Sequence, residues 1–131
     1  MSKFIVGLDL GTTSTKAIGL SPDGEVLATA SAPNRIFSGS PGSAWQDPRE
    51  VCRSAFNALT DLSRKIPFGN ALGICLSGAM HSLFPCAPDQ EPLMPATTWA
   101  DVRAGETAAS MHSLCNAAEL YRRTGCPLQY L

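Results

Sequence analysis

Residues 3–20 read KFIVGLDLGTTSTKAIGL, and this stretch decides the fold. Apolar and β-branched residues lead to a carboxylate at Asp9, a Gly-Thr-Thr triplet follows at residues 11–13, and a second apolar run comes after it. Leu8 and Leu10 alternate around Asp9 with the period of two that a strand requires. The pattern predicts a strand, a tight turn the size of a phosphate group, and a second strand.

The predicted turn carries groups that suit a phosphate. Gly11 has no Cβ, so its backbone can turn tightly and approach a ligand closely. The N–H and hydroxyl groups of Thr12 and Thr13 can point at phosphate oxygens, and Asp9 can hold a hydrated magnesium ion. Lys16 could add a cation, although a solvated surface lysine is the simpler interpretation. The alternative is an ordinary β-hairpin whose turn happens to be Gly-Thr-Thr, with Asp9 capping it.

Composition narrows the class of protein. The chain has 131 residues, the size of one domain, and 44% of them are hydrophobic, enough for a core. A formal net charge of −1, without charge runs, argues against a nucleic-acid surface or a polybasic membrane contact. The sequence contains neither a G-x-x-x-x-G-K-[ST] loop nor a G-x-G-x-x-G turn, so a P-loop and a Rossmann pyrophosphate site are excluded.

Cysteine use and hydropathy indicate the compartment. The five cysteines form no C-x-x-C pair, which argues against a disulfide framework and a zinc ribbon, and we expect them to be small buried apolar residues. No uninterrupted apolar stretch reaches the roughly eighteen residues of a membrane-spanning helix. The chain enters a strand at once, with no signal-peptide pattern, so we expect a cytoplasmic protein.

The next segments complete a predicted mixed sheet. After a turn at residues 21–24, residues 25–32 should form a third antiparallel strand. Residues 33–48 are rich in proline, glycine and serine and predict an ordered excursion. Asp47 should cap a helix from Pro48 to about Arg64, with Glu50 in an acidic variant of the capping box. Its apolar stripe consists of Val51, Ala55, Ala58, Leu59 and Leu62.

A helix that separates an antiparallel meander from an apolar strand indicates a mixed sheet. Residues 71–76 are almost wholly apolar and predict a strand buried on both faces. Residues 77–81 follow its carboxyl end, where α/β sheets bind ligands. We then expect a strand at 82–87, a turn at 88–90, an extended stretch at 92–99, a helix at 100–118 and a helical turn at 119–124 ended by Gly125.

Five motifs occur in the order found in FGGY-type carbohydrate kinases, which the sequence resembles over nearly its whole length. They are Asp9-Leu10-Gly11-Thr12-Thr13, Gln46-Asp47-Pro48, Ser77-Gly78-Ala79-Met80-His81-Ser82, Thr98-Trp99-Ala100-Asp101-Val102-Arg103 and Tyr121-Arg122-Arg123-Thr124-Gly125. Within the family, the A-M-H-S and T-W-A-D-x-R motifs look most like those of gluconate kinase. Xylulose kinase is the nearest competitor.

The resemblance implies ATP-dependent phosphorylation of a sugar or sugar acid. It implies the α/β ribonuclease-H-like fold of the actin, hexokinase and Hsp70 superfamily, with a mixed five-stranded sheet and helices. Such kinases have two domains with the active site in the cleft between them. Residues 1–131 would then be an incomplete N-terminal domain, because relatives run to several times this length.

The resemblance also assigns roles to residues. Asp9 would be a partner of the magnesium ion, through water, and Gly11, Thr12 and Thr13 would cradle the transferred phosphate. A second group would lie at the sugar site, namely Met80, His81, Trp99 and Asp101. ATP and magnesium are the implied cofactors, and a small-molecule sugar or sugar acid is the implied partner. The carboxylate that accepts the substrate hydroxyl proton is expected beyond Leu131, so the chain alone should not turn over.

Several residues keep a second interpretation. His81 and Trp99 could be structural, and Asp101 should also cap the following helix. Arg103 is expected to pair with an acid or the helix surface, and mid-helix His112 to be structural. Trp45 stands where relatives carry an acid, which leaves a substrate contact from that loop open.

Two alternatives to a kinase remain. They are a noncatalytic nucleotide-binding module related to actin and an inactive fragment. An exposed apolar surface is expected where the rest of the first lobe would lie, so we expect self-association.

Overall fold

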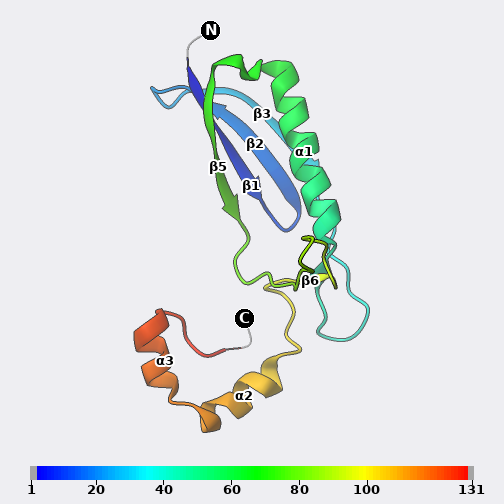
Figure 1. The fold of residues 1–131 in the computed structure, drawn as a ribbon, viewed down its shortest axis with the longest axis vertical. Helices are drawn as coiled ribbons and strands as arrows, with labels where there is room; N and C mark the ends of the chain where they lie inside the picture. Colours follow the sequence, from blue (N-terminus) through cyan, green and yellow to red (C-terminus); the bar gives the residue numbers. More distant parts are fainter. Residues whose placement is uncertain (1–2, 130–131) are drawn as a thin grey trace.

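The computed structural model describes residues 3–129 and has the predicted α/β architecture (Figure 1). The larger unit contains strands β1 (Phe4–Leu10), β2 (Ser14–Leu20), β3 (Val26–Pro33) and β5 (Ala71–Gly78) with helix α1 (Pro48–Lys65). Short strands β4 (Trp45–Gln46) and β6 (Ala96–Thr97) form a second sheet. Helices α2 (Gly105–Leu114) and α3 (Ala117–Thr124) complete the chain, and a 3₁₀ turn at Phe68–Asn70 precedes β5.

The main sheet is mixed, as predicted. Its order is β3-β2-β1-β5, with antiparallel pairing from β1 to β2 and from β2 to β3, and parallel pairing of β1 with β5. The register places Asp9 opposite Lys16 on β2 and Ser77 on β5. The phosphate-sized turn therefore joins two strands at the middle of the sheet.

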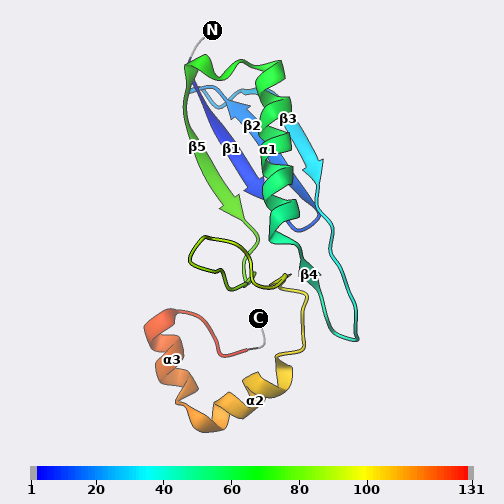
Figure 2. The same ribbon diagram turned by 45° about the vertical axis from the view of Figure 1, so that its right-hand side comes forward.

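Helix α1 covers one face of the sheet, over β2 and β3 (Figures 1 and 2). Alternation along β1 turns Phe4, Val6 and Leu8 toward this face, where they are buried with Ala58 and Leu62 of the helix. The helix begins as predicted, because Asp47 Oδ1 accepts a hydrogen bond of 2.9 Å from the Arg49 N–H.

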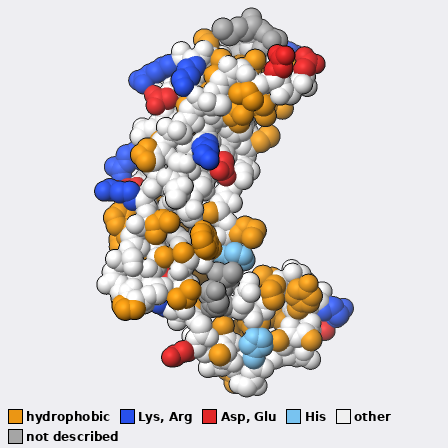
Figure 3. All heavy atoms as spheres, turned by 180° about the vertical axis from the view of Figure 1, so that it is seen from behind, with side chains coloured by type: hydrophobic (Ala, Val, Ile, Leu, Met, Phe, Trp, Pro, Cys, Tyr) orange, Lys and Arg blue, Asp and Glu red, His pale blue; other side chains and the backbone are white. Residues whose placement is uncertain are grey.

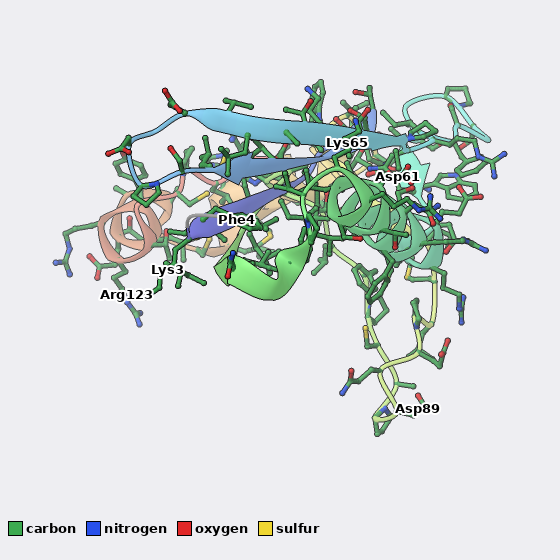
Figure 4. All side chains as sticks on the ribbon, turned by 90° about the horizontal axis from the view of Figure 1, so that it is seen from above. Lys3, Phe4, Asp61, Lys65, Asp89 and Arg123 are labelled. Carbon is green, nitrogen blue, oxygen red and sulfur yellow. The ribbon has the colours of Figure 1, made fainter. Side chains whose placement is uncertain are left out.

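The C-terminal end of α1 is tied to the sheet edge. Lys65 Nζ donates to the Thr29 carbonyl of β3 at 2.6 Å, and the view from above shows Lys65 on the helix beside that strand (Figure 4). At the other end, Glu50 forms an ion pair with Arg35. The predicted capping box is therefore not formed, because the Glu50 carboxylate accepts from Arg35 and, among the described residues, no bond joins it to the Asp47 N–H.

The prediction of five strands in the main sheet was wrong, because the described residues place four there. Residues 82–87 do not join the sheet and make single bridges, from Leu83 to Thr97 and from Cys86 to Pro92. Pro85 lies between these bridges and has no N–H to continue a ladder. The turn that follows is present, since Gln90 N–H donates to the Ala87 carbonyl at 2.9 Å.

The prediction that residues 71–76 are buried on both faces was also wrong. The exposed fractions of Leu72, Ile74 and Leu76 are 61%, 49% and 73%. The reason is the placement of α1 over β2 and β3, which leaves β5 without a covering helix in the described chain (Figure 2). An apolar strand at the edge of the sheet therefore faces solvent.

Two further predictions need correction. The cysteines are not buried: Cys52, Cys75, Cys86 and Cys126 are exposed and Cys115 is half-buried. The expected helix at 100–118 is shorter, because α2 starts at Gly105 and ends before Asn116, which caps α3 through a 3.0 Å bond to Glu119 N–H. Gly125 ends α3 with a φ of 71°, as predicted.

The C-terminal helices lie away from the sheet. Helices α2 and α3 occupy the far end of the molecule, so the outline is hooked, with a notch between them and the main body (Figures 1 and 3). Hydrophobic side chains gather on both sides of this notch (Figure 3). Asp89 lies at the tip of a loop that projects away from the sheet (Figure 4).

Candidate functional site

The turn between β1 and β2 is tight at Gly11. A Cβ at this position would lie 2.7 Å from the Ser14 carbonyl oxygen and 3.5 Å from Asp9 Oδ2. The nearer atom belongs to the backbone and cannot move aside without moving the turn. Gly11 therefore lets the chain fold back on itself close to the Asp9 carboxylate, as the sequence predicted.

Hydrogen bonds hold four consecutive carbonyl groups of this turn. Ala79 N–H donates to the Leu10 oxygen at 3.1 Å, and Asn34 N–H donates to the Thr13 oxygen at 2.9 Å. Asn34 Nδ2 donates to the Gly11 oxygen at 2.7 Å, and Gln46 Nε2 donates to the Thr12 oxygen at 2.9 Å. Three segments of the chain thus meet behind the turn.

Sequence reasoning missed the roles of Asn34 and Gln46. Gln46 was visible as part of the Gln-Asp-Pro motif, but nothing in the motif says that its side chain reaches residue 12. Asn34 carried only one weak signal, an asparagine two residues after the end of the strand predicted at residues 25–32. Both side chains are buried in the structure, with exposed fractions of 9% for Asn34 and 6% for Gln46.

Asp9 lies on the face of the sheet opposite α1, in a row of polar residues. The register aligns Ser31, Lys16, Asp9 and Ser77 across the four strands, and all four line one open hollow. Lys16 is exposed, as expected for a surface lysine. Asp9 is likewise exposed and free to meet a ligand.

The donor set around Asp9 fits a magnesium ion that keeps most of its water. Magnesium is commonly bound by one or two carboxylates together with substrate phosphates. Within residues 3–129 no group of three or more histidine, cysteine, aspartate or glutamate side chains could hold a metal by itself. Asp9 is exposed and Gly11 presents no side chain next to its Oδ2, so the residues present fit an ion held through water by one carboxylate.

The loop after β5 brings Met80 and His81 close to the phosphate turn. Ala79 N–H binds the Leu10 carbonyl, so the two following residues leave the sheet beside the turn. Met80 is 72% exposed, and His81 is exposed with a φ of 61°, in the left-handed region. Neither side chain contributes to the core, which leaves both available for a ligand.

Trp99 and Asp101 have opposite environments. Trp99 is half exposed, whereas Asp101 is buried and binds protein groups through both carboxylate oxygens. Asp101 Oδ2 accepts from Ala44 N–H at 3.1 Å, and the Arg103 guanidinium donates to both oxygens. Hydrogen bonding to Arg103 holds the pKa of the Asp101 carboxyl well below its ordinary value. Asp101 therefore fixes a loop and does not cap α2, while Arg103 pairs with an acid as predicted.

The candidate substrate loops are joined to each other by the small sheet. Trp45 pairs with Thr97, and Leu83 bridges to the same residue. Thr98 N–H donates to the Ala44 carbonyl at 3.0 Å. The loops that carry Met80, His81, Trp99 and Asp101 therefore meet at the carboxyl end of β1 and β5 (Figure 1).

The structure also gives contacts for His112, which was expected to be structural, and for Trp45, whose substrate contact the sequence left open. His112 Nε2 lies 3.0 Å from the Leu128 carbonyl, so this histidine has a local partner on the C-terminal segment. Trp45 stacks on Phe37 with ring centroids 4.5 Å apart.

In the part of the chain that the structure describes, no helix combines the length and apolar character needed to cross a bilayer.

Comparisons with known proteins agree with this geometry. Residues 4–131 match the FGGY family of carbohydrate kinases, N-terminal domain. The chain is 32% identical over 128 residues to gluconokinase from Bacillus subtilis, covering 98% of the chain and 25% of that protein. It is 37% identical over 105 residues to xylulose kinase from Lactococcus lactis, covering 79% of the chain and 21% of that protein. The chain thus spans about a quarter of the length of these relatives.

Solved structures give the same result. The gluconate kinase from Lactobacillus acidophilus matches with a TM-score of 0.88 and 32% identity, over 98% of this chain and 26% of that one. The xylulose kinase from Rhodospirillum rubrum matches with a TM-score of 0.91 and 29% identity, over 97% of this chain and 26% of that one. Because the family model matches residues 4–131 and the solved kinases share the fold of nearly the whole chain, the chain belongs to the FGGY family of carbohydrate kinases.

Proposed function

We propose that residues 1–131 form the first part of a two-lobed, ATP-dependent kinase that phosphorylates a sugar acid, gluconate. The observation that carries the proposal is the turn at residues 11–13, held from behind and lying beside the exposed Asp9 carboxylate. The similarity to gluconokinase over 98% of the chain supports the choice of substrate.

Gly11, Thr12 and Thr13 would cradle the transferred phosphate, and Asp9 would hold magnesium through water. Phosphoryl transfer depends mainly on positioning and on neutralising the charge of the phosphate oxygens. Magnesium, when bound, would supply much of that neutralisation. The chain's own contribution is the fixed turn, the N–H and hydroxyl donors and one carboxylate, with the general base expected beyond Leu131.

Met80, His81, Trp99 and Asp101 would form the sugar site. A polyol requires a few well-placed donors and acceptors next to an apolar or aromatic wall. Exposed Trp99 and Met80 suit the wall, and His81 suits a hydroxyl. Asp101 already binds Ala44 and Arg103, which supports a contribution through the loop that it holds in place.

A pentulose kinase is the second candidate, and the identity of 37% to a xylulose kinase over 105 residues favours it. A third candidate is a noncatalytic nucleotide-binding module or an inactive fragment. We place the protein in the cytoplasm and propose that it forms homo-oligomers, with no nucleic-acid or membrane partner.

A coupled kinase assay tests the proposal. The complete polypeptide that contains this chain is assayed with magnesium-ATP and gluconate, xylulose, ribulose or glycerol. We expect the highest kcat/KM with gluconate, and Asp9→Asn should lower kcat while Asp23→Asn, in an exposed turn, should not. Turnover of xylulose without gluconate would move the assignment to a pentulose kinase.

A binding measurement separates the noncatalytic alternative. Isothermal titration of the 131-residue chain with magnesium-ATP should show weak or no binding if the second lobe is needed. Tight binding by the chain alone, together with no turnover of any sugar by the complete polypeptide, would favour a nucleotide-binding module.

A further inference from the structure

We propose that Asn34 and Gln46 are positioning residues that hold the phosphate turn in its ligand-binding form. This inference rests on the proposed function and extends it to two residues that touch neither phosphate nor sugar. Asn34 supplies two of the hydrogen bonds behind the turn, from its backbone to Thr13 and from its side chain to Gly11. Gln46 supplies a third, to Thr12.

Burial makes these contacts hard to replace. The side chains of both amides are shielded from water, so a lost partner would leave a buried polar group unsatisfied. Asn34 Nδ2 also donates to Thr15 Oγ1 at 3.0 Å, and Gln46 Nε2 also reaches the Arg35 carbonyl at 3.3 Å. Each amide thus joins the turn to a second fixed group and has little freedom to move.

Because peptide groups are planar, the bonds that fix the carbonyls of the turn also fix the direction of its N–H groups. The peptide bonds of residues 11–14 are trans, and in a trans peptide the C=O of one residue points opposite to the N–H of the next. Holding the carbonyls of residues 11–13 from behind therefore turns the N–H groups of Thr12, Thr13 and Ser14 the other way. Successive N–H groups in a turn form an anion-binding concavity.

These N–H groups face the side of the sheet where a ligand would bind. Asn34 approaches from the α1 side, because Thr15, which it also binds, is fully buried there. Asp9 lies on the opposite face, one strand position from Leu10. Among the described residues neither Thr12 nor Thr13 donates its N–H to another group, so both amides remain available beside the carboxylate.

Gln46 also links the phosphate turn to the candidate sugar loops. Its backbone pairs with Ala96 in the small sheet, next to the segment that carries Trp99. Its side chain meanwhile holds Thr12. A change at this position should therefore disturb phosphate binding first, while the sugar loops keep their own contacts to Ala44 and Gly42.

Isosteric substitutions in the complete polypeptide test the inference. Asn34→Asp and Gln46→Glu keep the shape but place an acceptor where a donor met a carbonyl, so the turn should be released. We expect kcat/KM for magnesium-ATP to fall about tenfold or more, since small misplacements of reacting groups have such effects. Sugar affinity measured by titration should stay within about twofold. Hydrogen exchange of the backbone amides of residues 34 and 79, which donate to the Thr13 and Leu10 carbonyls of the turn, should become faster.

Matched controls use the same chemical changes at exposed positions. Asn57→Asp on α1 and Gln90→Glu on the projecting loop should leave all three readouts unchanged. If Asn34→Asp does not fold, Gln46→Met, which removes the donor without adding charge, gives the same test. Folded variants with unchanged kcat/KM for ATP and unchanged exchange would overturn the inference.

The proposed function can fail separately. If the wild-type protein phosphorylates no sugar, the kinase assignment is lost. Hydrogen exchange of the amides of residues 34 and 79 and titration with magnesium-ATP would still test whether Asn34 and Gln46 hold the turn. Faster exchange together with weaker nucleotide binding in both variants would then support the inference. Unchanged values in both measurements would reject it.

Discussion

Gly11 is the residue at which one added methyl group should reshape the candidate site. Because the Cβ of Gly11→Ala would lie 2.7 Å from the Ser14 carbonyl oxygen, the turn must shift. We expect kcat/KM for magnesium-ATP in the complete polypeptide to fall about 10- to 100-fold. Steady-state kinetics measure it, with Gly69→Ala as the control, since a Cβ there meets nothing within 4 Å. Equal effects of both substitutions would contradict the role of Gly11.

Asp101 gives a prediction about acid stability. Hydrogen bonding to Arg103 lowers the pKa of the folded-state carboxyl from its ordinary value of 3.8. The unfolded state therefore binds the proton more readily, so the contribution of Asp101 is fully present above pH 4 to 5 and is lost as the pH falls below about 4.

The measurement compares the wild type with Asp101→Asn. The difference in unfolding free energy between them, from urea titrations, should be constant near neutral pH and shrink below about pH 4. Asp89→Asn, at the exposed loop tip, is the control and should show no such trend. A difference that grows on acidification would mean that the carboxyl is not stabilised in its charged form.

At the scale of elements, the start of α1 depends on its cap. Asp47 accepts from Arg49 N–H, and no other side chain caps this end. Asp47→Ala should lower the free energy of unfolding by about 1 kcal/mol. Asp61→Ala changes charge identically on the same helix, but removes only an exposed pair with Arg64, and should cost less than about 0.5 kcal/mol. Urea titration at neutral pH compares them, and equal losses would reject the cap.

The elements that sequence predicted well are those specified locally. Alternation around Asp9 and the turn at residues 21–24 gave the hairpin and third strand, and Asp47-Pro48 with a 3.6-residue stripe gave α1. Asn116 shows the limit of such signals: it sits inside a pattern that reads as one helix, yet its side chain starts a new one.

Burial and long-range contacts could not be predicted in the same way. The apolar character of β5 indicated a strand but not which neighbour covers it, because that depends on where α1 lies. In the candidate site, the Gly-Thr-Thr turn was predictable from residue types alone. Asn34 and Gln46 were not, since they reach the turn across 23 and 34 residues of chain.

At the scale of the whole molecule, the uncovered strand creates an apolar groove. The groove lies between α1 and β5 and has a volume of about 470 Å³. Among its lining residues are Leu10, Val51, Phe56, Leu59, Leu76 and Phe84. Phe56 is 66% exposed and Leu76 is 73% exposed, and β5 also presents an unpaired strand edge. Exposed apolar patches and open edges favour association with another chain.

We therefore expect the 131-residue chain, studied alone, to self-associate through this groove. Leu76→Lys should reduce the association by at least about tenfold, because charged side chains on edge strands oppose pairing. Sedimentation velocity over a range of concentrations measures it, with Leu114→Lys, equally apolar and 82% exposed on α2, as the control. A monomer at all concentrations, or an equal effect of both lysines, would show that another surface or none drives association. Because neither substitution removes a core residue, a cooperative thermal transition in each variant would exclude unfolding as the cause.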